Sequence, residues 1–149
     1  MGTASQEPLI FRIFTEVSLI DQTLRTRLER ALPDGLRLAH FVALNHLVAI
    51  GESNPLELAR AFRVTKGAMT NTIQRLDARG FVDIRPDPRD GRAKLVAITA
   101  AGRDARKAAS KALAASFGEV SGTIPSEEIE LALPFLSALR VLLGQGDGC

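Results

Sequence analysis

Cysteine and histidine are scarce in this chain of 149 residues, and their scarcity excludes most metal and thiol chemistry. The one cysteine, Cys149, is the last residue, and no second thiol exists to resolve a sulfenic acid. The two histidines, His40 and His46, are six residues apart on a predicted helix, so they lie on different faces of it. No HxxxH spacing or cysteine pair supplies a metal site. We therefore expect no metal and no cofactor, and we expect that Cys149 is not a redox switch.

Long apolar runs are also missing. Residues 131–136 (LALPFL) form one of the longest, far short of the roughly 18 residues that span a membrane. No basic start followed by an apolar segment marks an export signal, and no Gly-rich nucleotide-binding loop is present. An apolar content of 46% argues against disorder. These features predict a cytoplasmic protein of one domain, residues 1–149, that does not contact a membrane and is not an enzyme.

The charges are unevenly distributed, although the formal net charge is only +2. Residues 60–111, the central basic segment, hold thirteen Lys or Arg against five Asp, whereas the rest of the chain holds six basic against twelve acidic residues. Such a division is typical of a protein that presents one face to a polyanion. Chance clustering on a solvated surface is the alternative.

Two short helices are predicted within residues 54–79. Asn54 is placed to cap the first, with Pro55 at its first position and Glu57 completing a capping box. Thr65 is placed to cap the second, which Gly80 ends. The close succession of the two helices predicts a helix-turn-helix.

The second of these helices has an apolar and a polar face. Met69, Ile73 and Leu76 keep helical spacing and are expected to face the core. The polar side chains can meet phosphates and base edges, and Gly67 permits close approach of a backbone. The residues that we expect to contact the major groove are Thr65, Lys66, Gly67, Thr70, Asn71, Gln74 and Arg75. A solvated amphipathic helix would show a similar division.

A β-hairpin is predicted after this helix. Residues 81–85 and 94–98 are rich in β-branched side chains, and the segment between them is polar and bounded by Pro, Asp and Gly. We interpret it as a hairpin with an extended loop rather than a tight two-residue turn. Its arginines either contact nucleic acid or pair with Asp87 and Asp90.

Both ends of the chain predict apolar helices, over residues 8–32 and 124–143. Their apolar residues occupy too many sides to be covered by one small domain, so burial against a second subunit is expected. Pro134 predicts a kink or a break in the last helix. A connecting helix over residues 99–117 carries Arg103, Arg106, Lys107 and Lys111, which either extend a phosphate-binding surface or form a solvated face.

Two segments resemble the MarR family of bacterial transcription regulators. Residues 87–103 (DPRDGRAKLVAITAAGR) are similar to the family's wing and following helix start, and Leu58-Ala59 with residues 64–70 (VTKGAMT) is similar to its helix-turn-helix. The resemblance covers nearly the whole chain. It implies a mainly α (α+β) fold, with a winged helix-turn-helix core at residues 36–98 and dimerisation helices at both ends. It also implies that Arg89 and Arg92 enter the minor groove, with Arg92 leading and Asp90 orienting the neighbouring arginines.

We therefore expect a homodimeric repressor that binds double-stranded DNA at a pseudo-palindromic operator. The alternative is a winged-helix module that binds another protein and does not use DNA. In this family a small aromatic or phenolic effector often binds between the dimerisation helices and the core. The resemblance implies a crevice lined by Phe11, Phe14, Arg37, His40 and Phe41, although these residues could equally be packing.

Overall fold

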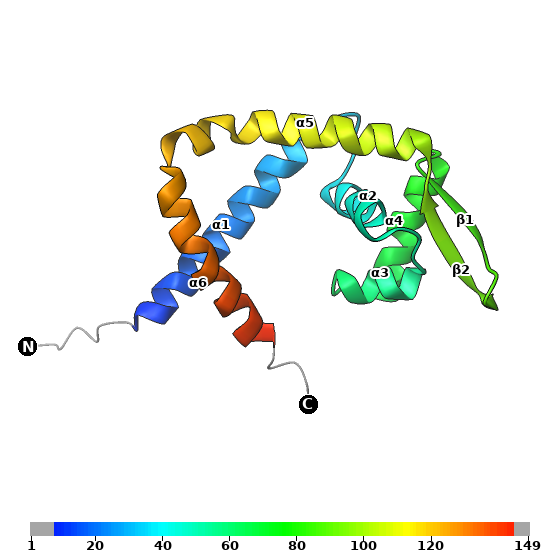
Figure 1. Ribbon diagram of the computed structural model, residues 1–149, viewed down its shortest axis with the longest axis horizontal. Helices are drawn as coiled ribbons and strands as arrows, with labels where there is room; N and C mark the ends of the chain where they lie inside the picture. Colours follow the sequence, from blue (N-terminus) through cyan, green and yellow to red (C-terminus); the bar gives the residue numbers. More distant parts are fainter. Residues whose placement is uncertain (1–7, 145–149) are drawn as a thin grey trace, which may run out of the picture. The chain divides into compact units, whose positions relative to one another are not determined.

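The computed structural model describes residues 8–144, which form six helices and one two-stranded antiparallel sheet (Figure 1). The elements are α1 (Leu9–Ala31), α2 (Leu38–Ile50), α3 (Pro55–Ala61), α4 (Lys66–Ala78), β1 (Val82–Asp87), β2 (Asp90–Ile98), α5 (Ala100–Thr123) and α6 (Ser126–Gly144). Contacts divide the chain into two compact units, one ending at Leu113 and the other beginning at Ala114. Cys149, and the prediction made for it, lie outside the described residues.

The core of the first unit lies between α2, α4 and the sheet. Its largest fully buried side chains are Leu44, Leu58, Leu76 and Val96. Met69, Ile73 and Leu76 of α4 are at most 4% exposed, which confirms their predicted orientation. Burying one apolar face while the other stays polar fixes the rotation of α4 about its axis.

The predicted helix-turn-helix is present. Asn54 and Glu57 form the reciprocal capping box, with the backbone N–H of each bonded to the other's side chain. Thr65 caps α4 by accepting a hydrogen bond from the backbone N–H of Ala68 at 3.1 Å. Arg63, in the turn between the helices, has a φ of 51°, a left-handed conformation that non-glycine residues seldom adopt.

The hairpin departs from its prediction, because its turn is tight. Strands β1 and β2 extend to Asp87 and Asp90, which pair with each other, and only Pro88 and Arg89 lie between them. The Asp87 carboxylate accepts a hydrogen bond from the backbone N–H of Arg89 at 2.9 Å, and proline presets its own φ for such a turn. The prediction of an extended loop is therefore wrong. The extra length appears instead as an irregularity in β2, since Pro86 pairs with Lys94.

A short bridge joins the hairpin to the helix-turn-helix. Ser53, just before α3, exchanges two backbone hydrogen bonds with Val96 of β2, at 2.9 and 3.2 Å. Val96 is completely buried, so this bridge fixes the base of the hairpin. Figure 1 shows the hairpin extending away from the start of α5, with its turn at the far end.

Helix α5 is longer than the sequence indicated, and helix α6 is continuous. Helix α5 runs to Thr123 rather than to residue 117, because Gly118 lowers helix stability by only about 1 kcal/mol without ending the helix. Helix α6 continues through Pro134, so of the two predicted outcomes the break is wrong, and the kink stays a prediction. A proline removes one backbone hydrogen bond, and the other bonds of this 19-residue helix keep it in register.

Helices α1 and α6 contain no buried residue among those described. Leu9 is 73% exposed, and Leu131 and Leu142 of α6 are 79% and 66% exposed. No helix in residues 8–144 combines the length and the apolar character that a membrane span requires.

Candidate nucleic-acid interface

The outward face of α4 is polar along its length. Lys66, Asn71, Gln74 and Arg75 are exposed, and Thr70 is half-buried. A Cβ added to Gly67 would meet no atom within 4 Å, so the backbone there is open to a ligand. The structure thus brings the predicted major-groove residues together on α4, apart from Thr65, whose side-chain oxygen is used to cap the helix.

Two of these side chains bond to each other. The Nε of Arg75 donates to the Oδ1 of Asn71 at 3.2 Å, one helical turn away. The Thr70 hydroxyl donates to the backbone carbonyl of Lys66 at 2.8 Å. The hydrogen-bonding capacity that α4 offers to a partner is therefore already restricted by bonds within the helix.

The hairpin tip contains a carboxylate that holds one arginine. The Asp87 carboxylate is nearly buried and lies 3.3 Å from both the Nε and an Nη of Arg89. The hydrogen bond from the backbone N–H of Arg89, followed by the bonds from its side chain, lowers the pKa of Asp87. This pairing was the alternative considered for the wing, and it applies to Arg89.

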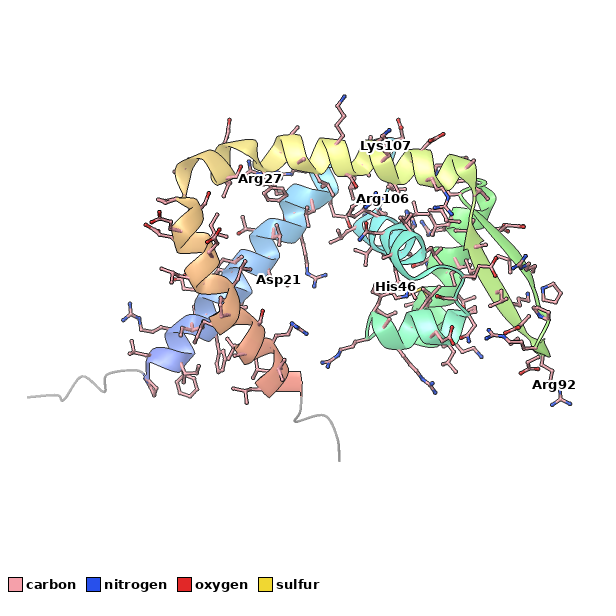
Figure 2. The ribbon with its side chains drawn as sticks, viewed as in Figure 1. Asp21, Arg27, His46, Arg92, Arg106 and Lys107 are labelled. Carbon is pink, nitrogen blue, oxygen red and sulfur yellow. The ribbon has the colours of Figure 1, made fainter. Side chains whose placement is uncertain are left out.

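Arg92 is presented differently. Its backbone N–H donates to the Oδ1 of Asp90 at 3.0 Å, and its side chain points away from the hairpin tip (Figure 2). Asp90, which was predicted to orient the neighbouring arginines, contacts Arg92 through this backbone bond, while Asp87 holds the Arg89 guanidinium. Both arginine side chains are exposed, but Asp87 already binds the Arg89 guanidinium, so Arg92 is the arginine that a groove could accept without disrupting this ion pair.

Comparisons with known proteins agree with this architecture. The family model described as MarR family matches residues 34–93. An uncharacterized HTH-type transcriptional regulator of Mycobacterium leprae is 35% identical over 102 residues, which cover 68% of this chain and 71% of that protein. BadR, a transcriptional activatory protein of Rhodopseudomonas palustris, is 30% identical over 138 residues, which cover 90% of this chain and 76% of BadR. The chain belongs to the MarR family.

Solved structures place the fold in the same family. A MarR family transcriptional regulator from Streptomyces coelicolor aligns with a TM-score of 0.79 and 29% identity, covering 93% of this chain and 98% of that one. MarR from E. coli complexed with operator DNA aligns with the same TM-score at 22% identity, covering 91% and 99%. This chain is therefore a MarR-type winged-helix transcriptional regulator, a class of DNA-binding proteins and not of enzymes.

Two contacts of this MarR-family chain were not predicted from the sequence. Arg85 of β1 forms an ion pair with Glu52 in the loop before α3. Arg106 of α5 donates two hydrogen bonds, at 2.8 and 3.1 Å, to the Oδ1 of Asn45 on α2 (Figure 2). Both join residues more than 30 positions apart, and no local pattern marks them. Arg106 thus ties α5 to the core, whereas Arg103, Lys107 and Lys111 are exposed.

His40 has a structural role. It is 6% exposed, and its Nδ1 accepts a hydrogen bond from the backbone N–H of Arg37 at 3.1 Å, at the start of α2. Burial, followed by the nearby Arg79 and Arg75, lowers the pKa of His40. An acceptor at this position requires the neutral imidazole.

The first unit contains a cavity of about 460 Å³. Its wall is mainly apolar and comes from α1, α2, the α3–α4 turn and the inner side of α4. It is lined by Asp21, Leu24, Arg25, Leu28, Glu29, Leu38, Ala39, Val42, Phe62, Val64, Ala68, Met69 and Thr72.

None of the five residues predicted for a ligand crevice lines this cavity. Phe11 and Phe14 contact each other on α1, with ring centroids 6.5 Å apart, and His40 is occupied with Arg37. Phe41 packs against the core. The crevice inferred from the resemblance is thus a different location from this cavity, and it stays a prediction.

Proposed function

We propose that the protein is a homodimer that binds a pseudo-palindromic operator in double-stranded DNA. The observation that carries the proposal is the outward face of α4, which presents cationic, amide and hydroxyl side chains and one carboxylate, Asp77, near its end, while the opposite face is buried. In the proposed complex, α4 of each subunit enters a major groove and Arg92 enters the adjacent minor groove. The E. coli structure with operator DNA supports this arrangement, because it has the same fold.

The apolar surfaces of α1 and α6 support the dimer. Each helix exposes several large apolar side chains and buries none of its described residues. A second copy of the chain would cover such surfaces and would give the twofold symmetry that a palindromic site requires.

A salt titration tests DNA binding directly. We expect binding to duplex DNA whose affinity falls steeply with salt, because lysines and arginines that meet phosphates release counterions. Absence of binding at low salt would instead favour a winged-helix module that binds protein. Selection of bound duplexes from a random library in the same assay would provide the operator sequence.

We further propose that the protein acts in the cytoplasm as a repressor. When its operator overlaps a promoter, the bound protein would block RNA polymerase. When the operator lies upstream of the promoter, the bound protein could instead assist polymerase. BadR is named as an activatory protein, so a reporter with the selected operator placed at each position is the appropriate test. Loss of expression at the overlapping position is expected.

A small aromatic or phenolic effector is proposed for the cavity. Part of the cavity wall lies on α4 and is formed by Ala68, Met69 and Thr72. A bound effector would therefore contact the DNA-binding helix directly. Phenol and benzoate serve as probes, with release of DNA as the measured effect. Ala39→Phe would fill the cavity from an exposed position and should abolish release while leaving DNA binding intact. An unchanged response in Ala39→Phe would exclude this cavity.

A further inference from the structure

The Asn71–Arg75 pair determines which hydrogen-bonding groups α4 can recognise. Both residues are exposed and lie one turn apart, on the side of the helix away from Ile73 and Leu76. The Arg75 Nε lies 3.2 Å from the Asn71 Oδ1. Since a guanidinium can only donate hydrogen bonds, the amide atom that faces it must be the oxygen. This requirement fixes the orientation of the Asn71 amide.

The pair offers mainly donors to a partner. With one lone pair of its oxygen bonded to Arg75, Asn71 offers the two N–H bonds of its amide nitrogen and one remaining lone pair. Arg75 offers the Nη edge of its guanidinium, and its Nε is already used. An asparagine recognises adenine by accepting from the N6 amino group while donating to N7, and this amino group would have to share the Asn71 oxygen with the cationic guanidinium of Arg75. Guanine presents two acceptors, N7 and O6, to the major groove, which match the two Nη donors of Arg75.

We propose that Arg75 recognises a guanine in each half-site and that Asn71 is a positioning residue that aims Arg75 and does not recognise adenine. Holding the guanidinium by its Nε in the free protein removes part of the conformational entropy that a long side chain would lose on binding. The inference rests on the proposed DNA-binding function, and it concerns how one base pair is selected.

The test uses the full-length protein and the operator selected from random duplexes, with each base pair of a half-site replaced in turn. Arg75→Ala should lose roughly 5- to 150-fold of preference for guanine at one base pair. Asn71→Ala should lose a smaller part of the preference at that same base pair. Because Asn71 acts through Arg75, the double variant should discriminate no worse than Arg75→Ala alone. Asp77→Ala, at the exposed end of α4, is the control and should leave the preference at this base pair unaffected.

Several results would overturn the inference. One such result is that Asn71→Ala relaxes a preference for adenine. Another is that the double variant loses the sum of the preferences lost by Asn71→Ala and Arg75→Ala. Arg75→Ala could instead weaken all sequences equally and lower the salt slope by about one, which would show that Arg75 binds a phosphate. Thermal unfolding of each variant separates these results from a folding defect. If the parent binds no duplex at all, the proposed function fails first, and this inference fails with it.

Discussion

Gly102 lies against the backbone of Phe81, so closely that a Cβ on Gly102 would sit 2.0 Å from the Phe81 carbonyl oxygen. The first turn of α5 is thereby packed directly onto the start of the hairpin. Thr99 stabilises the same junction by hydrogen bonds: its hydroxyl donates to the Gly80 carbonyl at 2.6 Å and accepts from the Gly102 N–H at 3.1 Å. The Ile-Thr-x-x-Gly sequence at 98–102 is thus explained by a crowded junction between α4, the hairpin and α5.

Gly102→Ala should destabilise the fold, because the obstructing atom is backbone and cannot rotate away. The expected loss in free energy of unfolding is about 1–3 kcal/mol, the usual cost of overpacking. Denaturant unfolding measures it. Gly118→Ala is the matched control on the same helix, where a Cβ meets nothing within 4 Å, and it should be neutral or slightly stabilising. Equal effects of the two substitutions would contradict the close packing at Gly102.

Arg92→Ala should weaken operator binding and reduce the preference for A·T pairs that flank the half-sites. Narrow A·T-rich minor grooves concentrate negative potential and attract an exposed guanidinium. Thermal stability should change little, because Arg92 is exposed at the hairpin tip. Arg89→Ala is the control, since Asp87 already holds that guanidinium. If Arg89→Ala removes the A·T preference and Arg92→Ala does not, the assignment of the wing residue is wrong.

Protonation of His40 should destabilise the protein in mild acid. Its pKa is lowered in the folded state by burial and by Arg79, Arg75 and Arg37, while Glu29 acts in the opposite direction. The unfolded chain therefore takes up the proton first, and stability falls as the pH drops below ~6.5. His40→Gln should flatten the dependence of unfolding free energy on pH between about 5 and 7. A slope that persists in His40→Gln would contradict this assignment.

Leu142→Asp should convert the dimer to a monomer without unfolding the subunit. Leu142 is 66% exposed in the single chain, so the substitution costs little there, whereas in an interface it would bury an unpaired charge. Leu139→Asp tests the same surface from a half-buried position. Sedimentation velocity at micromolar concentration measures the outcome. Ser137→Asp adds the same charge elsewhere on α6 and should leave the dimer intact; a parent protein that sediments as a monomer would refute the dimer and the palindrome together.

The local sequence was sufficient for the helix-turn-helix. The capping box at Asn54 and Glu57, the cap at Thr65 and the buried spacing of Met69, Ile73 and Leu76 are all confirmed. Each depends on residues within one or two helical turns, so the chain specifies it without long-range contacts. The tight turn could also have been found locally, because an Asp-Pro pair at its first two positions is a known turn signature.

Other features required the tertiary structure. The pairs Arg85–Glu52 and Arg106–Asn45 join distant segments, and the wall of the cavity comes from three helices and a turn. The sequence also left undetermined which arginines of the central basic segment remain available to DNA. A count of charges treats Arg89, Arg92 and Arg106 alike. The chain by itself determined which residue types lie on α4 and at the hairpin tip, because helical and strand periodicity are local. The folded arrangement decided that Asp87 holds Arg89, that Asn45 holds Arg106 and that Arg92 remains exposed, because hydrogen bonds to a side chain depend on where the backbone brings its partner.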